Sequence, residues 1–533
     1  MRFGHQKRGK KMSKKINGIF TIAVCLAMTL GMFGECTGKK EKVLVIGMNT
    51  GPIVSLDPAA AYEFEGSWIL DNVCDTLVRF KPGSASEIVP CLATSWDISG
   101  RTLTFTIREG VKFSSGDPLD AEAVVYSLKR AIKLAQAPSW VLTQFGITED
   151  SIKATGNTVE ITMDKSYSSS LVLSCMTYSV SGVVNPKVAE ENAKEGDMGM
   201  AYLTDHSEGS GPFVLVSWNR NEKIVLKRNE HYWGRKPQID RIIIIDIPES
   251  SSQLLQLKGG TIDVAWNLEH DQIPHVEATE GLYTITKPQF KLIYLGMNAE
   301  HPPLDNVLVR RAIKSAIDTG AIIKAKGGGV TELHTFIPDG MFAHYDGQAY
   351  SYDPERAKEL LAEAGYPNGF EITLTVPDFL ATEGTIVKTY LEEVGIKTNL
   401  QVIAYTTLLG KYRKQGLQMV IARWGADYAD PDANAKPFAH CRTTGPDAKV
   451  KQLMWRNAYA NPEFTDIVEK AAFIENIDER EQAYIELQKK WQEDGPFEIL
   501  YQTGAQLGLN DGVQNFMLNE LTQTPWQYIT IED

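Results

Sequence analysis

A strand-helix-strand pattern in the C-terminal half constrains the fold more than any other feature of the sequence. Asp353 can cap a helix whose first turn holds Pro354, and apolar residues then recur at helical spacing until Gly365 ends the helix. A strand-like alternation follows over residues 370–376, then a second helix over 386–394 and a second alternation over 397–403. This order predicts an α/β domain.

The length of the chain, 533 residues, predicts more than one domain. A single hydrophobic core stops growing well below this size, so we expect roughly two to four domains. Residues 42–48 form a short apolar run that predicts the first strand of the mature fold. Residues 103–107 predict a second strand, and residues 120–132 a helix that Asp120 can start.

The net charge of −13 argues against a nucleic-acid partner. The first 35 residues carry seven Lys and Arg side chains against one Glu, so the rest of the chain is more acidic than the total. No basic stripe interrupts this acidic body, and a phosphate backbone would be repelled. We therefore expect no nucleic acid as a partner.

The N-terminus predicts export from a bacterial cytoplasm. A basic segment precedes an uncharged apolar run over residues 16–34, and Cys36 follows. We predict a signal peptide over residues 1–36 with lipidation at Cys36, although Glu35 departs from the small residue usual before a lipidated cysteine. An ordinary cleaved signal and an uncleaved membrane anchor remain open. All three place the body in the periplasm or at the cell surface.

The remaining cysteines do not predict a functional thiol. Cys74, Cys91, Cys175 and Cys441 lack Cys-x-x-Cys spacing, which argues against a zinc cluster or a redox pair. In an oxidising compartment Cys74 and Cys91 could form a disulfide, and buried free thiols are the alternative.

A series of short blocks follows a fixed order along the chain: residues 90–96 (PCLATSW), 105–118 (FTIREGVKFSSGDP), 209–213 (GSGPF), 229–234 (NEHYWG), 309–313 (VRRAI), 316–318 (AID), 353–370 and 422–431 (ARWGADYADP). In kind and in order these blocks resemble those of the family 5 extracellular solute-binding proteins, the peptide- and nickel-binding receptors of ABC importers. The resemblance covers nearly the whole mature chain.

The resemblance implies a periplasmic-binding-protein-like fold of the class C type, with two lobes, an extra inserted domain and a two-strand hinge. We place the discontinuous lobe I at residues 42–79, 206–294 and 498–533, the inserted domain II at 80–205, and lobe III at 295–497. Residues 294–298 and 498–501 would be the two crossing strands. A hinge of this kind closes two lobes around a ligand.

By the same resemblance, Asp427 would receive the α-amino group of a peptide, with Trp424 and Gly425 beside the peptide backbone. An ammonium in a closed cleft needs an opposite charge, because an unpaired buried cation is costly. Asp427 could instead cap the turn before Asp430 and Pro431, and Asp430 itself is typical of a turn before proline.

Further candidates for the cleft come from the early segment and from two isolated aromatic residues. Residues 56–64 resemble the part of the family that faces the ligand, which makes Tyr62, Glu63 and Phe64 candidate lining residues, with packing in the lobe as the alternative. Trp266 and Tyr501 are weaker candidates because each lies in a stretch that suits a core. The sequence names no residue for the ligand carboxylate, and the basic loop 324–329 is more typical of a solvated loop.

Catalytic motifs do not occur in the sequence. There is no His-Glu-x-x-His, no Gly-x-Ser-x-Gly and no Walker-type phosphate loop, and Asp427 and Asp430 on one turn need not face a common glycosidic bond. We expect no catalytic residue, no resident metal and no cofactor. ATP hydrolysis would belong to a separate transporter subunit.

We therefore predict a monomeric, exported and lipid-anchored receptor that binds short peptides and presents them to ABC permease subunits. One alternative is the same fold with another ligand, namely a nickel chelate, an oligosaccharide, haem or an opine. Another is that the protein serves a sensory receptor. A secreted hydrolase is the remote alternative.

Overall fold

The computed structural model describes residues 41–532. The predicted signal peptide and Cys36 lie outside this range. Within it, no helix is long and apolar enough to cross a membrane. The cysteines at positions 74, 91, 175 and 441 are buried free thiols.

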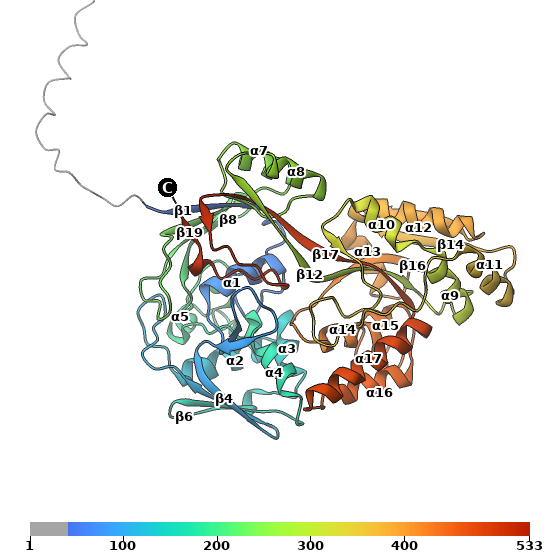
Figure 1. Ribbon diagram of the computed structural model, residues 1–533. Helices are drawn as coiled ribbons and strands as arrows, with labels where there is room; N and C mark the ends of the chain where they lie inside the picture. The colour runs from blue at the N-terminus through green and yellow to red at the C-terminus, as the bar shows by residue number, and fades with distance from the viewer. Residues whose placement is uncertain (1–40, 533) are drawn as a thin grey trace, which may run out of the picture. The chain divides into compact units, whose positions relative to one another are not determined.

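One large mixed sheet connects the two halves of the described chain (Figure 1). Its strand order is β15-β14-β16-β12-β17-β11-β1-β10-β9-β8, and β13 pairs with β17 outside this path. The bounds are β1 (Val43–Met48), β8 (Phe213–Asn219), β9 (Lys223–Arg228), β10 (Arg241–Asp246), β11 (Val264–Ala265), β12 (Leu282–Met297), β13 (Val330–Thr331), β14 (Glu371–Pro377), β15 (Lys397–Ile403), β16 (Met419–Gly425) and β17 (Phe497–Asn510).

Strands β12 and β17 are the longest and join the halves as an antiparallel pair. Tyr294 lies opposite Ile499 and Leu295 opposite Glu498 in their register, so both predicted crossing segments are strands and they pair with each other. On one side β17 pairs with β11, and on the other β12 pairs with β16. Two paired strands are thus a continuous connection between the halves.

The strand-helix-strand pattern is confirmed. Asp353 caps α11 (Pro354–Glu363) by accepting a hydrogen bond from the backbone N–H of Arg356. Strands β14 and β15 pair in parallel, joined by α12 (Ala381–Glu393). This second helix begins five residues before the predicted start, because the 3₁₀ turn Asp378–Leu380 runs directly into it. Helices α9 (Val307–Ala316), α10 (Thr319–Lys326), α11 and α12 lie beside β14 and β16 in Figure 1.

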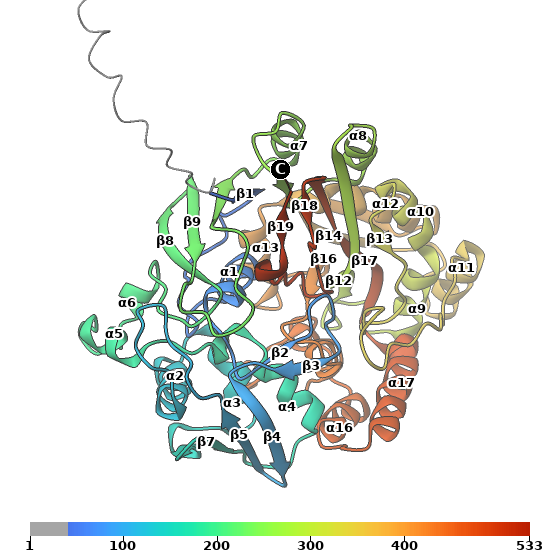
Figure 2. The ribbon, with the colours of Figure 1, turned by 60° about the vertical axis from the view of Figure 1, so that its left-hand side comes forward.

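A separate antiparallel sheet of order β4-β5-β7-β6 lies within residues 93–162 (Figure 2). Its strands are β4 (Ala93–Ser99), β5 (Thr102–Ile107), β6 (Ile152–Thr155) and β7 (Thr158–Thr162). Asp120 caps α2 (Ala121–Leu134), which confirms the predicted helix and its start, and α2 packs on this sheet. The sheet and helix share the largest core cluster, which includes the fully buried Phe105.

That core cluster continues into a helical layer near the C-terminus. Helices α16 (Pro462–Ala471) and α17 (Ile477–Asp494) pack on each other and near α14 (Asp432–Ala439). The N-terminus of α4 (Ser169–Met176) contacts this layer, because the N–H of Ser168 bonds to the carbonyl of Ala472 at 2.9 Å. Residues about 300 positions apart in the chain therefore meet at this layer.

Candidate functional site

Asp427 lies immediately beyond the end of β16, next to the crossing strand β12. The register pairs Lys291 of β12 with Gly425, and the N–H of Ala426 bonds to the carbonyl of Phe290 at 2.9 Å. The ladder therefore fixes the backbone up to Ala426. The carboxyl group that follows is positioned by a strand rather than by a free loop.

The Asp427 carboxyl takes part in a chain of hydrogen bonds that spans three distant segments. The hydroxyl of Tyr62 donates to Asp427 Oδ2 at 3.1 Å, and Trp140 Nε1 donates to the Tyr62 hydroxyl at 2.8 Å. Tyr62 is 36% exposed, so this chain is open to solvent at its middle member. The Asp427 carboxylate is thus oriented by one hydroxyl donor, and its side chain is half-buried.

No cationic side chain of residues 41–532 forms an ion pair with Asp427. Burial raises the pKa of its carboxyl to about 7, against the smaller lowering by the Tyr62 hydrogen bond. The charged form of a desolvated carboxylate is stabilised when a cation binds beside it. The geometry therefore suits a ligand ammonium.

The two neighbouring carboxylates on the same turn already have cationic partners. Asp430 is held by both terminal nitrogens of Arg480, at 2.7 Å each. Asp432 lies 2.8 Å from the Lys436 ammonium and accepts from the Tyr428 hydroxyl at 2.8 Å. Asp430 also accepts from the N–H of Asp432, which is the turn geometry expected before Pro431. Of these three carboxylates, Asp427 alone lacks a cation among the described residues.

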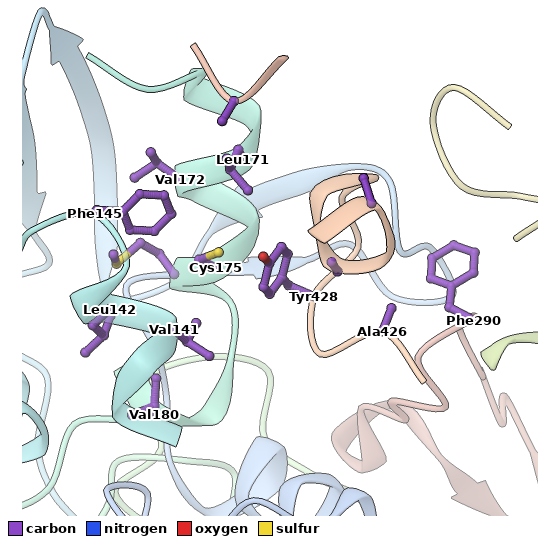
Figure 3. Close-up of a cluster of buried hydrophobic side chains, with 14 of the residues drawn as sticks. Val141, Leu142, Phe145, Leu171, Val172, Cys175, Val180, Phe290, Ala426 and Tyr428 are labelled. Carbon is purple, nitrogen blue, oxygen red and sulfur yellow. The ribbon is translucent and has the colours of Figure 1, made fainter. Parts of the chain in front are cut away.

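Aromatic rings surround Asp427. Tyr178 meets Tyr62 edge-on with centroids 6.4 Å apart, and Trp140 lies 6.1 Å from Tyr428. Figure 3 shows Tyr428 reaching toward Cys175 of α4. These rings lower the local polarity, which is why burial dominates the shift of the Asp427 pKa.

Gly425 and Trp424 form the wall beside Asp427. A Cβ on Gly425 would lie 2.7 Å from the Phe64 ring and 3.1 Å from the Lys291 side chain, so only glycine allows this approach. Trp424 packs edge-on against Phe438, and its buried Nε1 has no hydrogen-bond partner within the described range. The structure thus brings Phe64 of the early segment against the motif.

Glu63 and Phe64 lie at the start of α1 (Phe64–Val73), and both are half-buried. The Glu63 carboxylate accepts from the N–H of Tyr62 at 3.3 Å, so it helps to hold the segment that carries the Tyr62 hydroxyl. The three predicted residues 62–64 therefore lie together with residues 424–427, and their contact with a ligand stays a prediction.

Trp266 and Tyr501 lie elsewhere. Trp266 is 3% exposed and packs against Trp68 and Phe516 in a hydrophobic core. Tyr501 is 2% exposed and donates to Glu383 at 2.7 Å. Both side chains have packing roles in this structure, and their ligand-binding role stays a prediction.

Two residues near Asp427 carry no motif in the sequence. Trp140 supplies the first donor of the hydrogen-bond chain, and Tyr178 completes the aromatic wall. Both come from the segment between β5 and β8, far along the chain from Asp427. Trp140 begins the short helix α3 (Trp140–Thr143) and Tyr178 lies in the bend after α4, so no local pattern in the sequence marks either residue.

Metal-ligating residues do not cluster in the described part of the chain, where no three His, Cys, Asp or Glu side chains could hold an ion together. His440, the one histidine near the motif, pairs with Glu469 at 3.0 Å.

A model of the bacterial extracellular solute-binding proteins, family 5, matches residues 87–446. The chain belongs to this family. Among its relatives, the probable D,D-dipeptide-binding periplasmic protein of Escherichia coli K12 is 28% identical over 91% of this chain and 93% of that protein. Heme-binding protein A of Haemophilus influenzae is 28% identical over 78% of this chain and 79% of that protein.

A solved structure confirms the two-lobe periplasmic-binding-protein fold. The ABC transporter-associated periplasmic binding protein of Helicobacter pylori, in complex with the peptide STSA, superposes with a TM-score of 0.79 at 26% identity. The match covers 92% of this chain and 98% of that chain. The expected fold class and family are therefore correct.

Proposed function

We propose that this family 5 protein is an extracytoplasmic receptor that binds short peptides and delivers them to an ABC permease. The observation that carries the proposal is the Asp427 carboxylate, which is oriented by Tyr62 and has no cationic partner among residues 41–532, while Asp430 and Asp432 beside it have one each. The α-ammonium of a peptide would supply that cation. Dipeptide- and peptide-binding relatives support a peptide as the cargo.

In this proposal the ligand amine enters between the segment 62–64 and the segment 424–427. The ammonium displaces water and forms a charge-assisted hydrogen bond with Asp427, which is roughly twice as strong as a neutral one. The Tyr62 hydroxyl keeps the carboxylate oriented. Closure about β12 and β17 would bury the pair, and the permease would favour the closed form.

The remaining parts of the proposal concern organisation and location. Residues 42–79, 206–294 and 498–533 would form lobe I, residues 80–205 the inserted domain, and residues 295–497 lobe III. The protein would act as a monomer without catalysis in the periplasm or at the cell surface, and lipidation at Cys36 would anchor it to a bacterial membrane. The family and its relatives are solute-binding proteins, which supports a role in capture.

Isothermal titration with a short peptide and with its Nα-acetylated form tests the proposal. Wild type should bind the free amine at least about a hundredfold more tightly, since an unpaired buried charge costs several kcal/mol. Asp427→Asn should remove this preference. The matched control is Asp447→Asn, which alters an exposed aspartate in another loop. Equal binding of free and acetylated peptide by wild type would contradict the proposal.

A haem or opine cargo would give a different outcome. Such a ligand would bind while peptides failed to compete, and the Asp427→Asn change would affect it only as far as it carries a cationic nitrogen. The relative that is named for haem makes this the outcome to include in the titration.

A further inference from the structure

Lys291 is a half-buried cation on the crossing strand β12, one strand away from the Asp427 motif. Its ammonium lies 4.2 Å from the centre of the Phe64 ring and 5.7 Å from that of Trp68. Its stem passes over Gly425, where only a glycine leaves room. The Lys291 side chain is therefore fixed by packing against Phe64 of the early segment and Gly425 of the motif.

A second cation lies next to Lys291. The register pairs Gly425 with Lys291 and Arg423 with Ile293, so Arg423 and Lys291 are diagonal neighbours on the same face of the ladder. The Arg423 guanidinium stacks near Phe379 and Tyr405, with distances of 5.1 and 5.2 Å to the ring centres. Two like charges on adjacent strands repel each other, which makes the place attractive for an anion.

No carboxylate of residues 41–532 forms an ion pair with either cation. Glu65 favours the charged form of Lys291 from a greater distance, whereas burial and Arg423 oppose it and lower the pKa of the ammonium to about 8. The indole Nε1 of Trp68, which lies beside Lys291, is buried and has no hydrogen-bond partner in the described chain. An anion bound here would contact the Lys291 ammonium and could accept a hydrogen bond from Trp68 Nε1.

We propose that Lys291, assisted by Arg423, holds the carboxylate end of the ligand while Asp427 holds its amine. The ligand would be a zwitterion whose two charged ends lie on either side of the contact between Phe64 and Gly425. This inference rests on the proposed function, because it assigns the second end of the same ligand. It also explains why Lys291 forms no ion pair with a carboxylate of the described residues, since the ligand itself provides one.

The proposal separates two kinds of selectivity. Asp427 discriminates between free and blocked amines, whereas Lys291 discriminates between free and amidated carboxyl ends. A charged hydrogen bond in a partly desolvated site is worth about tenfold to a hundredfold in affinity. Amidation should therefore weaken binding by that factor without affecting recognition of the amine.

A mixed pool of di-, tri- and tetrapeptides, each with a free or an amidated carboxyl end, tests this by mass spectrometry of the peptides released from the purified complexes. Wild type should enrich the free acids about tenfold to a hundredfold over the amides. Lys291→Met keeps the apolar stem over Phe64 and removes the charge, so acids and amides should then bind within about threefold of each other. Lys258→Met, an exposed lysine on α7 (Ser250–Lys258), is the matched control and should keep the wild-type ratio.

Arg423→Gln provides a second variant on an exposed side chain, in case Lys291→Met does not fold. It should lower the acid-to-amide ratio partially. Equal enrichment of acids and amides by wild type, with binding still dependent on Asp427, would overturn the carboxylate assignment and leave the peptide function standing. An unchanged ratio in folded Lys291→Met would also overturn it. Failure of every peptide in the pool to bind would contradict the proposed function itself.

Discussion

The hydroxyl of Tyr62 donates a hydrogen bond to Asp427 across 365 positions of sequence, at 3.1 Å. The bond joins the segment between β1 and α1 to the turn that follows β16, and strands β1 and β16 lie on opposite sides of the long strands β12 and β17 in the sheet order. It also orients the one carboxylate of its turn that lacks a cation in the described chain. In the proposed function, this bond therefore connects the early segment to the carboxylate that would receive the ligand amine.

Tyr62→Phe should weaken binding of an amine-bearing peptide by about fivefold to tenfold, because one hydrogen bond to a charged acceptor is lost. Removal of this donor also takes away the group that lowers the Asp427 pKa, so the carboxyl should ionise at a higher pH in the variant. Titrations at pH 7 and pH 8 measure both effects. A variant with wild-type affinity at both pH values would show that the hydrogen bond does not orient the carboxylate.

The affinity for an amine-bearing peptide should rise with pH up to about 7 and then level off. The carboxyl pKa of Asp427 in the empty protein is raised to about 7 by burial, so below that pH the group must lose a proton before it can pair with the ammonium. The affinity should then fall by about tenfold per pH unit below 7. Above about pH 8 it should fall again as the peptide amine, whose pKa is about 8, loses its charge.

Asp427→Asn is the control for this profile, and it should abolish the acidic limb. Calorimetric titration between pH 5 and pH 9 with one peptide measures both proteins. An acidic limb that persists in Asp427→Asn would assign the titration to another group, such as Asp71, whose pKa burial also raises to about 7.

Asp427→Asn should also stabilise the empty protein at pH 8. A carboxyl with a folded pKa above its unfolded value binds more protons in the folded state between about pH 4 and 7, so its contribution to stability falls as the pH rises through that window. Above pH 7 the carboxylate is fully charged, so the full free-energy cost of burying an unpaired charge destabilises the wild-type fold. The neutral amide of Asp427→Asn avoids this cost. We expect a midpoint of thermal unfolding higher by about 2 °C at pH 8 and a smaller difference at pH 4.

Differential scanning fluorimetry of the two proteins without ligand measures this difference. A midpoint for Asp427→Asn that is lower than that of wild type at pH 8 would mean that the carboxylate stabilises the empty fold, and would argue for a capping role in place of ligand binding.

Arg480→Met should destabilise the fold by about 3–5 kcal/mol, because it leaves Asp430 buried without its cation. The Arg480 and Asp430 side chains are 0% and 3% exposed, and the guanidinium also donates to Ser170 Oγ at 3.0 Å. Urea unfolding measures the loss. The exposed pair of Arg442 with Glu469 is the control, and Arg442→Gln should barely move the urea midpoint. Similar midpoints for both variants would contradict the structural role of Arg480.

The sequence predicts the local elements well because their signals are local. Asp353, Pro354 and Gly365 specify one helix by their own backbone preferences, and the structure confirms it. The start of α12 is displaced because a 3₁₀ turn continues into the helix, and a helical period does not mark that boundary.

The candidate site is only partly visible in the sequence. Asp427 is marked by its neighbours in the chain, whereas Trp140 and Lys291 join it only through long-range contacts. Lys291 in particular looks like an ordinary strand lysine until the register places it over Gly425 and beside Arg423. A charged residue that lacks an ion-pair partner can be identified only once the fold shows which charged residues are paired with each other.

Native mass spectrometry of the exported protein, purified without refolding, tests the central claim most directly. Wild type should carry a spread of masses that resolve into short peptides with free amines, and Asp427→Asn should be purified largely empty. A single discrete sugar, metal chelate, haem or opine, retained equally by Asp427→Asn, would keep the fold and contradict the peptide assignment.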